Sequence, residues 1–359
     1  MGIEHLPTEI LGDIFLYLEC PRDLGNLSRC SKRLHWLCVP FLYATLKQTQ
    51  RGAPPSFIRT LMEKPHLINY VRNIEVSAFP GSLSEATIRV EKKEAIVNLS
   101  SLPAEQKGRI RLLLRDRCLG ASICGSWYQS LLAGFSWNAL VAFILLLCSH
   151  TIETFTIEHW GVRTPSPNFL SQFIRSSIHQ KEGEKTPKGS ISFPNLRRAK
   201  VLCSPARAAF GTEDDCHDIP YYLLQVESHF DICLERFCYG CMIPFETWPK
   251  REYSLRCRKI SFISCEVSFC DVSKVLTRCD SLERFECHFA CTSEMHRYRD
   301  LSEIKQGLLR SKNSLESLVL AGPAQAPYTA YYPNPPFRVE TSLGSLNQFE
   351  RLRVIDIEA

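Results

Sequence analysis

The chain has 359 residues, of which 45% are hydrophobic and 23% are charged, a balance typical of a folded protein long enough for two or more domains. Its formal net charge of +5 is spread along the sequence, so the concentrated basic stripe of a nucleic-acid-binding protein is missing and nucleic acid is not an expected partner. No basic segment runs into an apolar one at the amino terminus, so no secretory signal is expected, and the 17 cysteines are interpreted as reduced thiols of a cytoplasmic or nuclear protein.

Residues 6–46 contain three short amphipathic helical patterns. The first helix has an apolar stripe at helical spacing, made of Leu6, Ile10, Leu11, Ile14, Phe15 and Leu18. The second and third stripes are Leu24, Leu27 and Cys30, then Leu34 and Leu37. We expect Asp23 to cap the second helix and Ser31 to cap the third, which stops at Pro40. So short a segment cannot bury these side chains alone, so they need a partner, either the rest of the chain or another protein.

The segments LPTEILGDIFLYL from Leu6 and PRDLGNLSRCSKRL from Pro21, followed by Pro40-Phe41-Leu42-Tyr43, resemble an F-box of the form common in fungal F-box proteins. The resemblance implies that residues 1–48 form a helical module that docks on the Skp-type adaptor of a cullin-RING ubiquitin ligase. The implied adaptor contacts are Leu6, Pro7, Ile10, Leu11, Ile14, Leu18, Leu24, Leu27, Cys30 and Leu37. The chain departs from many F-boxes in having Leu34 where they have tryptophan, with Trp36 two residues later. The alternative is a helical cap that packs only on its own domain.

Beyond a polar break at residues 48–55, a pattern of the form apolar-x-x-apolar-x-apolar returns repeatedly. It begins at Val71, Ile152, Leu196, Leu234, Cys257, Leu282, Leu315 and Leu352. The alternation within each segment predicts a strand with one buried face, and similar strands at recurring intervals predict a solenoid.

The intervals between these segments are uneven. Only Leu234 to Cys257 and Cys257 to Leu282, at 23 and 25 residues, fall inside the usual leucine-rich range of about 20–29 residues. The pattern resembles the irregular leucine-rich repeats that follow many F-boxes, so residues 54–359 are expected to form an α/β leucine-rich-repeat-like solenoid. A doubly wound parallel sheet is the alternative, although no glycine-rich phosphate loop is present.

The connecting segments support helix-then-strand units. Residues 271–278 and 301–309 have apolar side chains at helical spacing just before two of the predicted strands. Residues 181–190 and 322–337 are expected to be loops. The strand predicted at Leu352 has little sequence after it, so we expect a chain that is cut short or an exposed terminal edge.

Leu131 to Cys148 is the one stretch with the hydropathy of a membrane segment. Its length is at the lower limit for a span, and the strand predicted at Ile152 follows almost at once. We therefore expect a buried helix that leads into this strand, with membrane association through residues 131–148 as the alternative.

No constellation of residues indicates catalysis or a bound metal. Cys238 and Cys241 form a CxxC, but a structural zinc site usually has a second such pair, and the acidic loop at residues 213–218 is typical of a solvated turn. No nucleophile elbow, HExxH, phosphate loop or dinucleotide motif appears, so neither cofactor nor enzymatic activity is expected. The loop at residues 322–337 carries aromatic side chains of the kind that anchor interfaces, and these are candidate target contacts: Tyr328, Tyr331, Tyr332 and Phe337.

Together these features indicate a non-catalytic interaction protein. The resemblance to F-box proteins implies substrate recognition in an SCF-type ubiquitin ligase, with the F-box docked on the Skp-type adaptor of the cullin complex and the repeats presenting a target protein. The alternatives are an interaction scaffold outside the ligase, a membrane-associated protein, and an enzyme whose cleft has no sequence signature. The identity of the target cannot be inferred from the residues.

Overall fold

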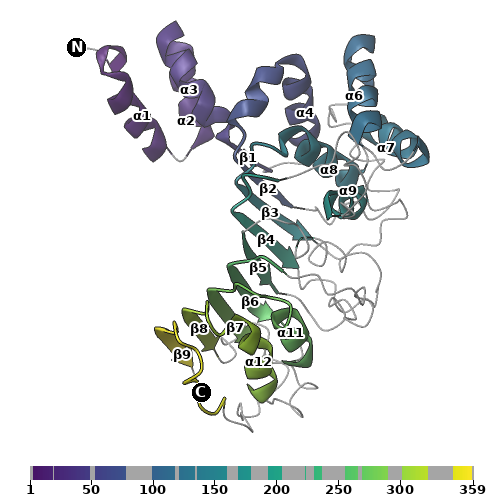
Figure 1. Ribbon diagram of the computed structural model, residues 1–359. Helices are drawn as coiled ribbons and strands as arrows, with labels where there is room; N and C mark the ends of the chain where they lie inside the picture. The colour runs from purple at the N-terminus through teal and green to yellow at the C-terminus, as the bar shows by residue number, and fades with distance from the viewer. Residues whose placement is uncertain are drawn as a thin grey trace, which may run out of the picture.

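The computed structural model describes residues 3–18, 20–48, 53–77, 99–117, 121–133, 136–159, 169–178, 193–203, 223, 230–236, 255–265, 269–289, 301–321 and 343–357 (Figure 1).

Three short helices lie at the amino terminus, after the 3-10 turn η1 (Ile3–His5): α1 (Thr8–Tyr17), α2 (Pro21–Cys30) and α3 (Lys32–Ala44). Ser31 caps α3 as predicted, since its hydroxyl accepts a hydrogen bond of 3.2 Å from the Leu34 amide. The prediction that this helix stops at Pro40 is wrong, because α3 continues through Pro40 to Ala44. The prediction that Asp23 caps α2 is wrong. The helix begins at Pro21, whose fixed φ suits the first helical position, so Asp23 lies inside the first turn.

Nine parallel strands form one open sheet, in which every strand lies beside the next one in the chain. The strands are β1 (Thr45–Lys47), β2 (Asn73–Ser77), β3 (Thr154–His159), β4 (Arg198–Cys203), β5 (Asp231–Glu235), β6 (Lys259–Cys265), β7 (Arg284–Phe289), β8 (Ser317–Ala321) and β9 (Val354–Ile357). A doubly wound sheet reverses its strand order at a switch point, whereas the order here runs from β1 to β9 without reversal.

Seven of the eight predicted strands are present, and each begins two residues after the first residue of its pattern. The segment predicted from Leu234 is wrong in register, because β5 is Asp231–Glu235 and Leu234 lies near its end. The buried residues of β5 alternate as Phe230, Ile232 and Leu234. The sequence Leu-Glu-Arg-Phe that begins at Leu234 has the same pattern as the start of a unit, although Leu234 lies near the end of the strand. Strand β1, inside the segment assigned to the helical module, was not predicted.

Helices lie along one side of the sheet (Figure 1). They are α4 (Ala53–Glu63), α6 (Ala104–Arg117), α7 (Ala121–Ala133), α8 (Trp137–Cys148), α9 (Phe169–Ile178), α11 (Phe269–Leu276) and α12 (Leu301–Leu308), with the 3-10 turns η2 (Pro65–Tyr70), η3 (Leu99–Ser101) and η8 (Leu309–Ser311). The helices predicted at residues 271–278 and 301–309 correspond to α11 and α12.

The core is built on rows of side chains that run across neighbouring strands. The strand pairing aligns one buried row, made of Ile74, Phe155, Ala199, Ile232, Ile260, Phe285 and Leu318. Two positions further along each strand lies a second buried row: Val76, Ile157, Val201, Leu234, Phe262, Cys287 and Leu320. The alternate positions face away from this core and are mostly polar, so the opposite side of the sheet is a polar surface.

Helix α8 is buried along nearly its whole length in this core, and a short turn joins it to β3. This is the placement expected for the apolar stretch that ends at Cys148. Among the described residues, no single helix has both the length and the hydropathy of a membrane span; α7 and α8 meet these criteria only as a pair, and their axes differ by 106°.

Strand β9 is the edge of the sheet, and its side chains remain accessible. Ile355 and Ile357 continue the two buried rows but are about half exposed, at 53% and 44%. The sequence expectation of an exposed terminal edge is thus met by the described residues.

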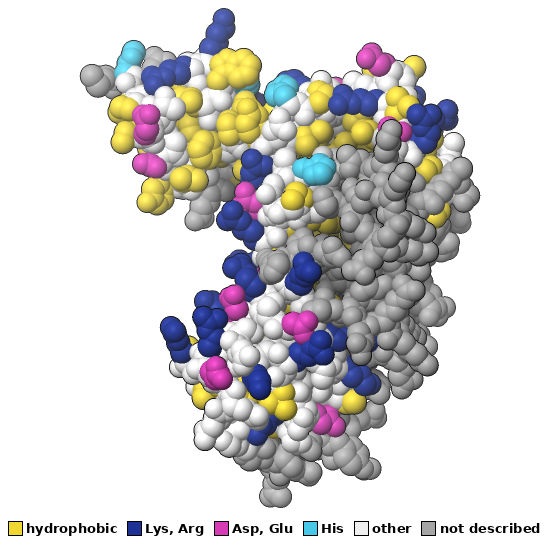
Figure 2. All heavy atoms as spheres, in the orientation of Figure 1, with side chains coloured by type: hydrophobic (Ala, Val, Ile, Leu, Met, Phe, Trp, Pro, Cys, Tyr) yellow, Lys and Arg dark blue, Asp and Glu magenta, His cyan; other side chains and the backbone are white. Residues whose placement is uncertain are grey.

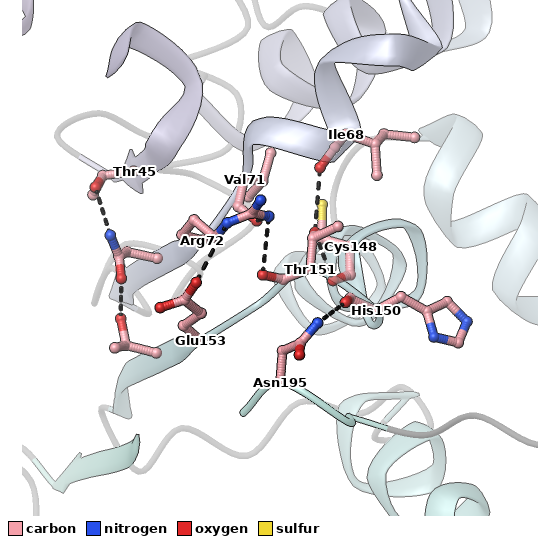
Figure 3. A network of polar contacts seen from close by, with 11 residues as sticks. Thr45, Ile68, Val71, Arg72, Cys148, His150, Thr151, Glu153 and Asn195 are labelled. Carbon is pink, nitrogen blue, oxygen red and sulfur yellow. Dashed lines mark hydrogen bonds and ion pairs between the residues drawn. The ribbon is translucent and has the colours of Figure 1, made fainter. Parts of the chain in front are cut away.

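The amino-terminal helices join the sheet without a loop, because β1 begins at the residue after α3. The Arg72 amide donates to the Ala44 carbonyl at 2.8 Å, and Asn73 links Thr45 to Thr154 through hydrogen bonds of 3.1 and 2.7 Å. Figure 3 shows the side-chain contacts at this junction, where the Arg72 side chain also lies 3.4 Å from the Glu153 carboxylate. The position of the helical module relative to the sheet is therefore held by direct contacts.

Candidate functional site

The three amino-terminal helices have a small core of their own. It is made of Leu11, Phe15, Leu24, Leu34 and Cys38. Phe15 packs edge-on against Phe41 with ring centroids 5.5 Å apart, and burial, with Cys30 nearby, raises the pKa of the Cys38 thiol. Leu34 occupies the core position, so its side chain does not contribute to the outer surface.

The ten predicted adaptor contacts divide into three groups by burial. Leu11 and Leu24 are buried in the three-helix core, so they support the outer surface and do not form part of it. Pro7, Ile10 and Cys30 are exposed. The remaining five are partly buried against the same core: Leu6, Ile14, Leu18, Leu27 and Leu37.

One apolar face of α1 stays accessible to a partner. Ile10 is 47% exposed, and Tyr17, two turns further along the helix, is 85% exposed. With Leu6, Pro7 and Ile14 they form a stripe that we call the adaptor face. Arg33 fixes its start, because the guanidinium donates to the Leu6 carbonyl oxygen at 2.8 Å. Figure 2 shows hydrophobic side chains gathered over these amino-terminal helices.

Four exposed apolar residues in this region were absent from the predicted set, and one of them, Ile3, lies in the turn η1 and is 41% exposed. Tyr17 follows Ile10 and Ile14 at helical spacing, so the periodicity that identified those residues also predicts it. Leu16 and Trp36 are 71% and 69% exposed, on other faces of α1 and α3, and no pattern of apolar residues indicated their exposure.

Apart from the adaptor face, a cluster of polar side chains lies on the open face of the sheet, on β6 and β7. The Glu286 carboxylate accepts hydrogen bonds from Lys259 at 2.8 Å and Ser261 at 3.0 Å, and lies 2.9 Å from the His288 ring nitrogen. Burial alone would raise the pKa of Glu286, but these hydrogen bonds and the Lys259 charge lower it. Serine and histidine both contact the carboxylate and not each other, so the cluster is not a nucleophile–base relay.

The predicted target contacts, and the two features that were considered and rejected as metal sites from the sequence, lie outside the described residues. These are the possible target contacts Tyr328, Tyr331, Tyr332 and Phe337, the pair Cys238 and Cys241, and the acidic loop at residues 213–218. Within the described part of the chain, no group of three metal-ligating side chains comes together.

Comparison with known proteins agrees with the geometry of the helical module. The F-box-like family model matches residues 3–49, which covers α1 to α3 and β1. No curated protein and no solved structure matches the chain. F-box domains generally bind Skp-type adaptors, and a Leu/Ile-rich surface of this kind is the means expected for such docking. The chain therefore carries an F-box-like domain at residues 3–49.

Proposed function

We propose that the protein is a substrate-recognition subunit of an SCF-type cullin-RING ubiquitin ligase. The F-box-like domain docks on a Skp-type adaptor, which links it to the cullin, and the sheet domain presents a target protein for ubiquitin transfer. The observation that carries the proposal is the match to the F-box-like model over a segment whose outer surface is apolar.

The adaptor face supplies the binding energy in this proposal. Ile10 and Tyr17 are 47% and 85% exposed, and burying them gives a favourable hydrophobic contribution of about 25 cal/mol per Å² of apolar area. Tyrosine is also enriched among interface residues whose truncation costs about 2 kcal/mol or more.

For the second half of the chain we propose an irregular leucine-rich-repeat-like architecture that binds the target. The sequential parallel strands, with helices along one side, support this reading. The junction at Arg72 and Asn73 supports a fixed placement of a bound target relative to the adaptor. In this role the chain contributes proximity and orientation while partner enzymes supply the chemistry, in the cytoplasm or the nucleus.

The test is calorimetric binding of the full chain to a purified Skp-type adaptor. The double variant Ile10→Asp with Tyr17→Asp places two charges on the adaptor face without altering the three-helix core, and we expect its affinity to fall at least about thirtyfold. The matched control is Leu112→Asp, at a 49% exposed apolar position on α6, which is expected to bind like the wild type.

Two results would overturn the proposal. One is wild-type affinity in the double variant, which would remove the adaptor face from the interface. The other is an absence of adaptor binding by the wild-type chain at micromolar concentrations. In that case the apolar face serves another partner.

A further inference from the structure

Four arginines stand exposed along the edge formed by the amino ends of strands β4 to β7. Arg197 and Arg198 lie at the start of β4, Arg258 immediately precedes β6, and Arg284 begins β7. The strand register aligns Arg198, Asp231, Lys259 and Arg284 as one row across the sheet. We call Arg197, Arg198, Arg258 and Arg284 the arginine row; Figure 2 shows Lys and Arg side chains along this side of the molecule.

Backbone hydrogen bonds fix the positions from which these side chains project. The Asp231 amide donates to the Arg197 carbonyl at 2.8 Å, and the Arg284 amide donates to the Arg258 carbonyl at 3.0 Å. The row is therefore part of the sheet ladder, and its spacing follows that of the strands.

The arginine row differs from the two lysines on the polar face of β4 and β6. Lys200 is paired with Glu235 at 2.6 Å, and Lys259 with Glu286 at 2.8 Å. None of the four arginines has a side-chain ion pair or hydrogen bond with another described residue. Their charges are thus left for solvent or for a partner.

The surrounding carboxylates only partly offset this charge. In the register across the sheet, Asp231 lies between Arg198 and Lys259, and Glu283 directly precedes Arg284. A fifth exposed arginine, Arg256, lies two residues before Arg258. Between β4 and β7, two carboxylates therefore stand among five unpaired arginines, which leaves a basic surface interrupted at defined points. Two more carboxylates flank this edge: Glu153 lies beside Arg197 and is paired with Arg72, and Glu316 lies beside Glu283.

We propose that the arginine row binds an acidic, extended peptide segment of a partner protein. Planar guanidinium groups bind carboxylates in a bidentate manner, which makes arginine suited to this ligand. Neighbouring strands are about 4.8 Å apart, so β4 to β7 spans about 14 Å, the reach of four or five extended residues. Alternate side chains of such a segment are about 6.6 Å apart, so two or three acidic residues match the row.

The interruptions favour a peptide over a nucleic acid. Asp231 and Glu283 would lie against a continuous phosphate backbone and repel it, whereas a peptide can place neutral residues opposite them. The inference rests on the proposed function, because the segment would belong to the target that the ligase subunit presents.

The experiment measures binding of a fluorescent peptide, Gly-Ser-Glu-Ser-Glu-Ser-Glu-Ser-Gly, to the full chain by anisotropy in 50 mM salt. The paired probe has glutamine in place of each glutamate. We expect the acidic peptide to bind, the glutamine peptide not to bind, and the affinity to fall several-fold in 300 mM salt. The variant Arg198→Glu with Arg284→Glu is expected to weaken acidic-peptide binding at least tenfold.

A control variant makes the same change of charge elsewhere. Arg109→Glu with Arg115→Glu reverses two exposed charges on α6 and is expected to weaken binding less than twofold. Equal losses in the two variants would overturn the proposal, because a general charge effect would then explain both. A lack of peptide binding by the wild type, or tighter binding of a single-stranded oligonucleotide than of the peptide, would also overturn it.

Adaptor binding is measured on the same preparations to separate this proposal from the first. The arginine variant should keep wild-type affinity for the adaptor, which also shows that its F-box-like domain is folded. The variant with Ile10→Asp and Tyr17→Asp should lose the adaptor and keep the peptide. Loss of both activities in the arginine variant would count against a separate site.

Discussion

Gly307 of α12 lies directly against Leu276 of α11. A β-carbon placed at position 307 would come 2.8 Å from the Leu276 Cβ and 2.9 Å from the Ser273 carbonyl oxygen. Both distances are shorter than van der Waals contact, so only a residue without a β-carbon allows the two helices to pack this closely.

The variant Gly307→Ala is therefore expected to lower the free energy of unfolding by about 1–3 kcal/mol, because the helices must separate to admit the methyl group. The control is Gly108→Ala on α6, where nothing lies within 4 Å of the added carbon, and which should gain up to about 1 kcal/mol from helix propensity. Urea denaturation of both variants measures the difference. Equal stability of the two would show that α11 and α12 are not in close contact.

Burial is expected to protect specific thiols from alkylation in the folded chain. Desolvation raises the pKa of Cys148 to about 12, so only about one molecule in 10⁴ carries the reactive thiolate at pH 8. Cys279 is hydrogen-bonded to Cys257, and this contact and burial raise its pKa well above the usual value. Among the described cysteines, iodoacetamide at pH 8 should label the exposed Cys20, Cys30 and Cys270 before Cys148 and Cys279, as measured by peptide mass spectrometry.

Early labelling of Cys148 in native buffer would contradict the prediction that burial protects this thiol. It would mean that α8 opens readily or lies outside the core. Labelling in urea supplies the reference, since all of these thiols should then react at similar rates.

The sequence predicts the strands because six of the seven correctly predicted units begin with a buried residue two positions before the strand; Leu352, before β9, is partly buried. Leu282, for example, is fully buried and lies two residues before β7 begins at Arg284. The six-residue pattern therefore includes the turn that leads into the sheet as well as the alternating residues of the strand. The register error at Leu234 has the same origin. A six-residue pattern does not distinguish the end of one strand from the start of another when both carry leucine and an aromatic residue.

The functional surface was less predictable than the fold. Periodicity places Ile10 and Leu11 together in one apolar stripe, although Ile10 faces out and Leu11 lies in the three-helix core. Only the packing of α1 against α3 decides which side of the stripe is covered. The arginine row is invisible in the sequence for a similar reason, because its members come from separate units that only the sheet register brings together.

The assignment of Ile10 to the outer surface and of Leu11 to the three-helix core can be tested by substituting each residue in turn. Leu11→Ala removes a fully buried side chain and should destabilise the F-box-like domain by about 2–5 kcal/mol, whereas Ile10→Ala should cost less than about 1 kcal/mol. Adaptor binding should weaken in both variants, but at low temperature, where Leu11→Ala remains folded, most of its loss should be recovered. Thermal unfolding followed by circular dichroism, with binding measured at two temperatures, separates the two effects. Greater destabilisation by Ile10→Ala than by Leu11→Ala would contradict the assignment.

The contacts of Glu286 also lead to a dependence of stability on pH. Burial opposes ionisation of this carboxyl, but hydrogen bonds from Lys259, Ser261 and His288 favour the carboxylate, and its pKa in the folded chain lies below the ordinary value. A group with a lowered folded pKa stabilises the protein above its unfolded pKa, and this contribution is lost as the pH falls through the folded value. The window therefore lies below the ordinary glutamate pKa of about 4.3.

The variant Glu286→Gln should be less stable than the wild type at pH 7, by up to about 1 kcal/mol, since the amide keeps the shape of the side chain but loses the charge-assisted hydrogen bonds. Below the window the difference should shrink, because the wild-type carboxyl is then protonated as well. Urea midpoints measured from pH 7 down to pH 3 follow the change, with Glu303→Gln on α12 as a control that also removes one carboxylate. A stability difference between wild type and Glu286→Gln that stayed constant over this range would show that the carboxylate charge contributes nothing to the cluster.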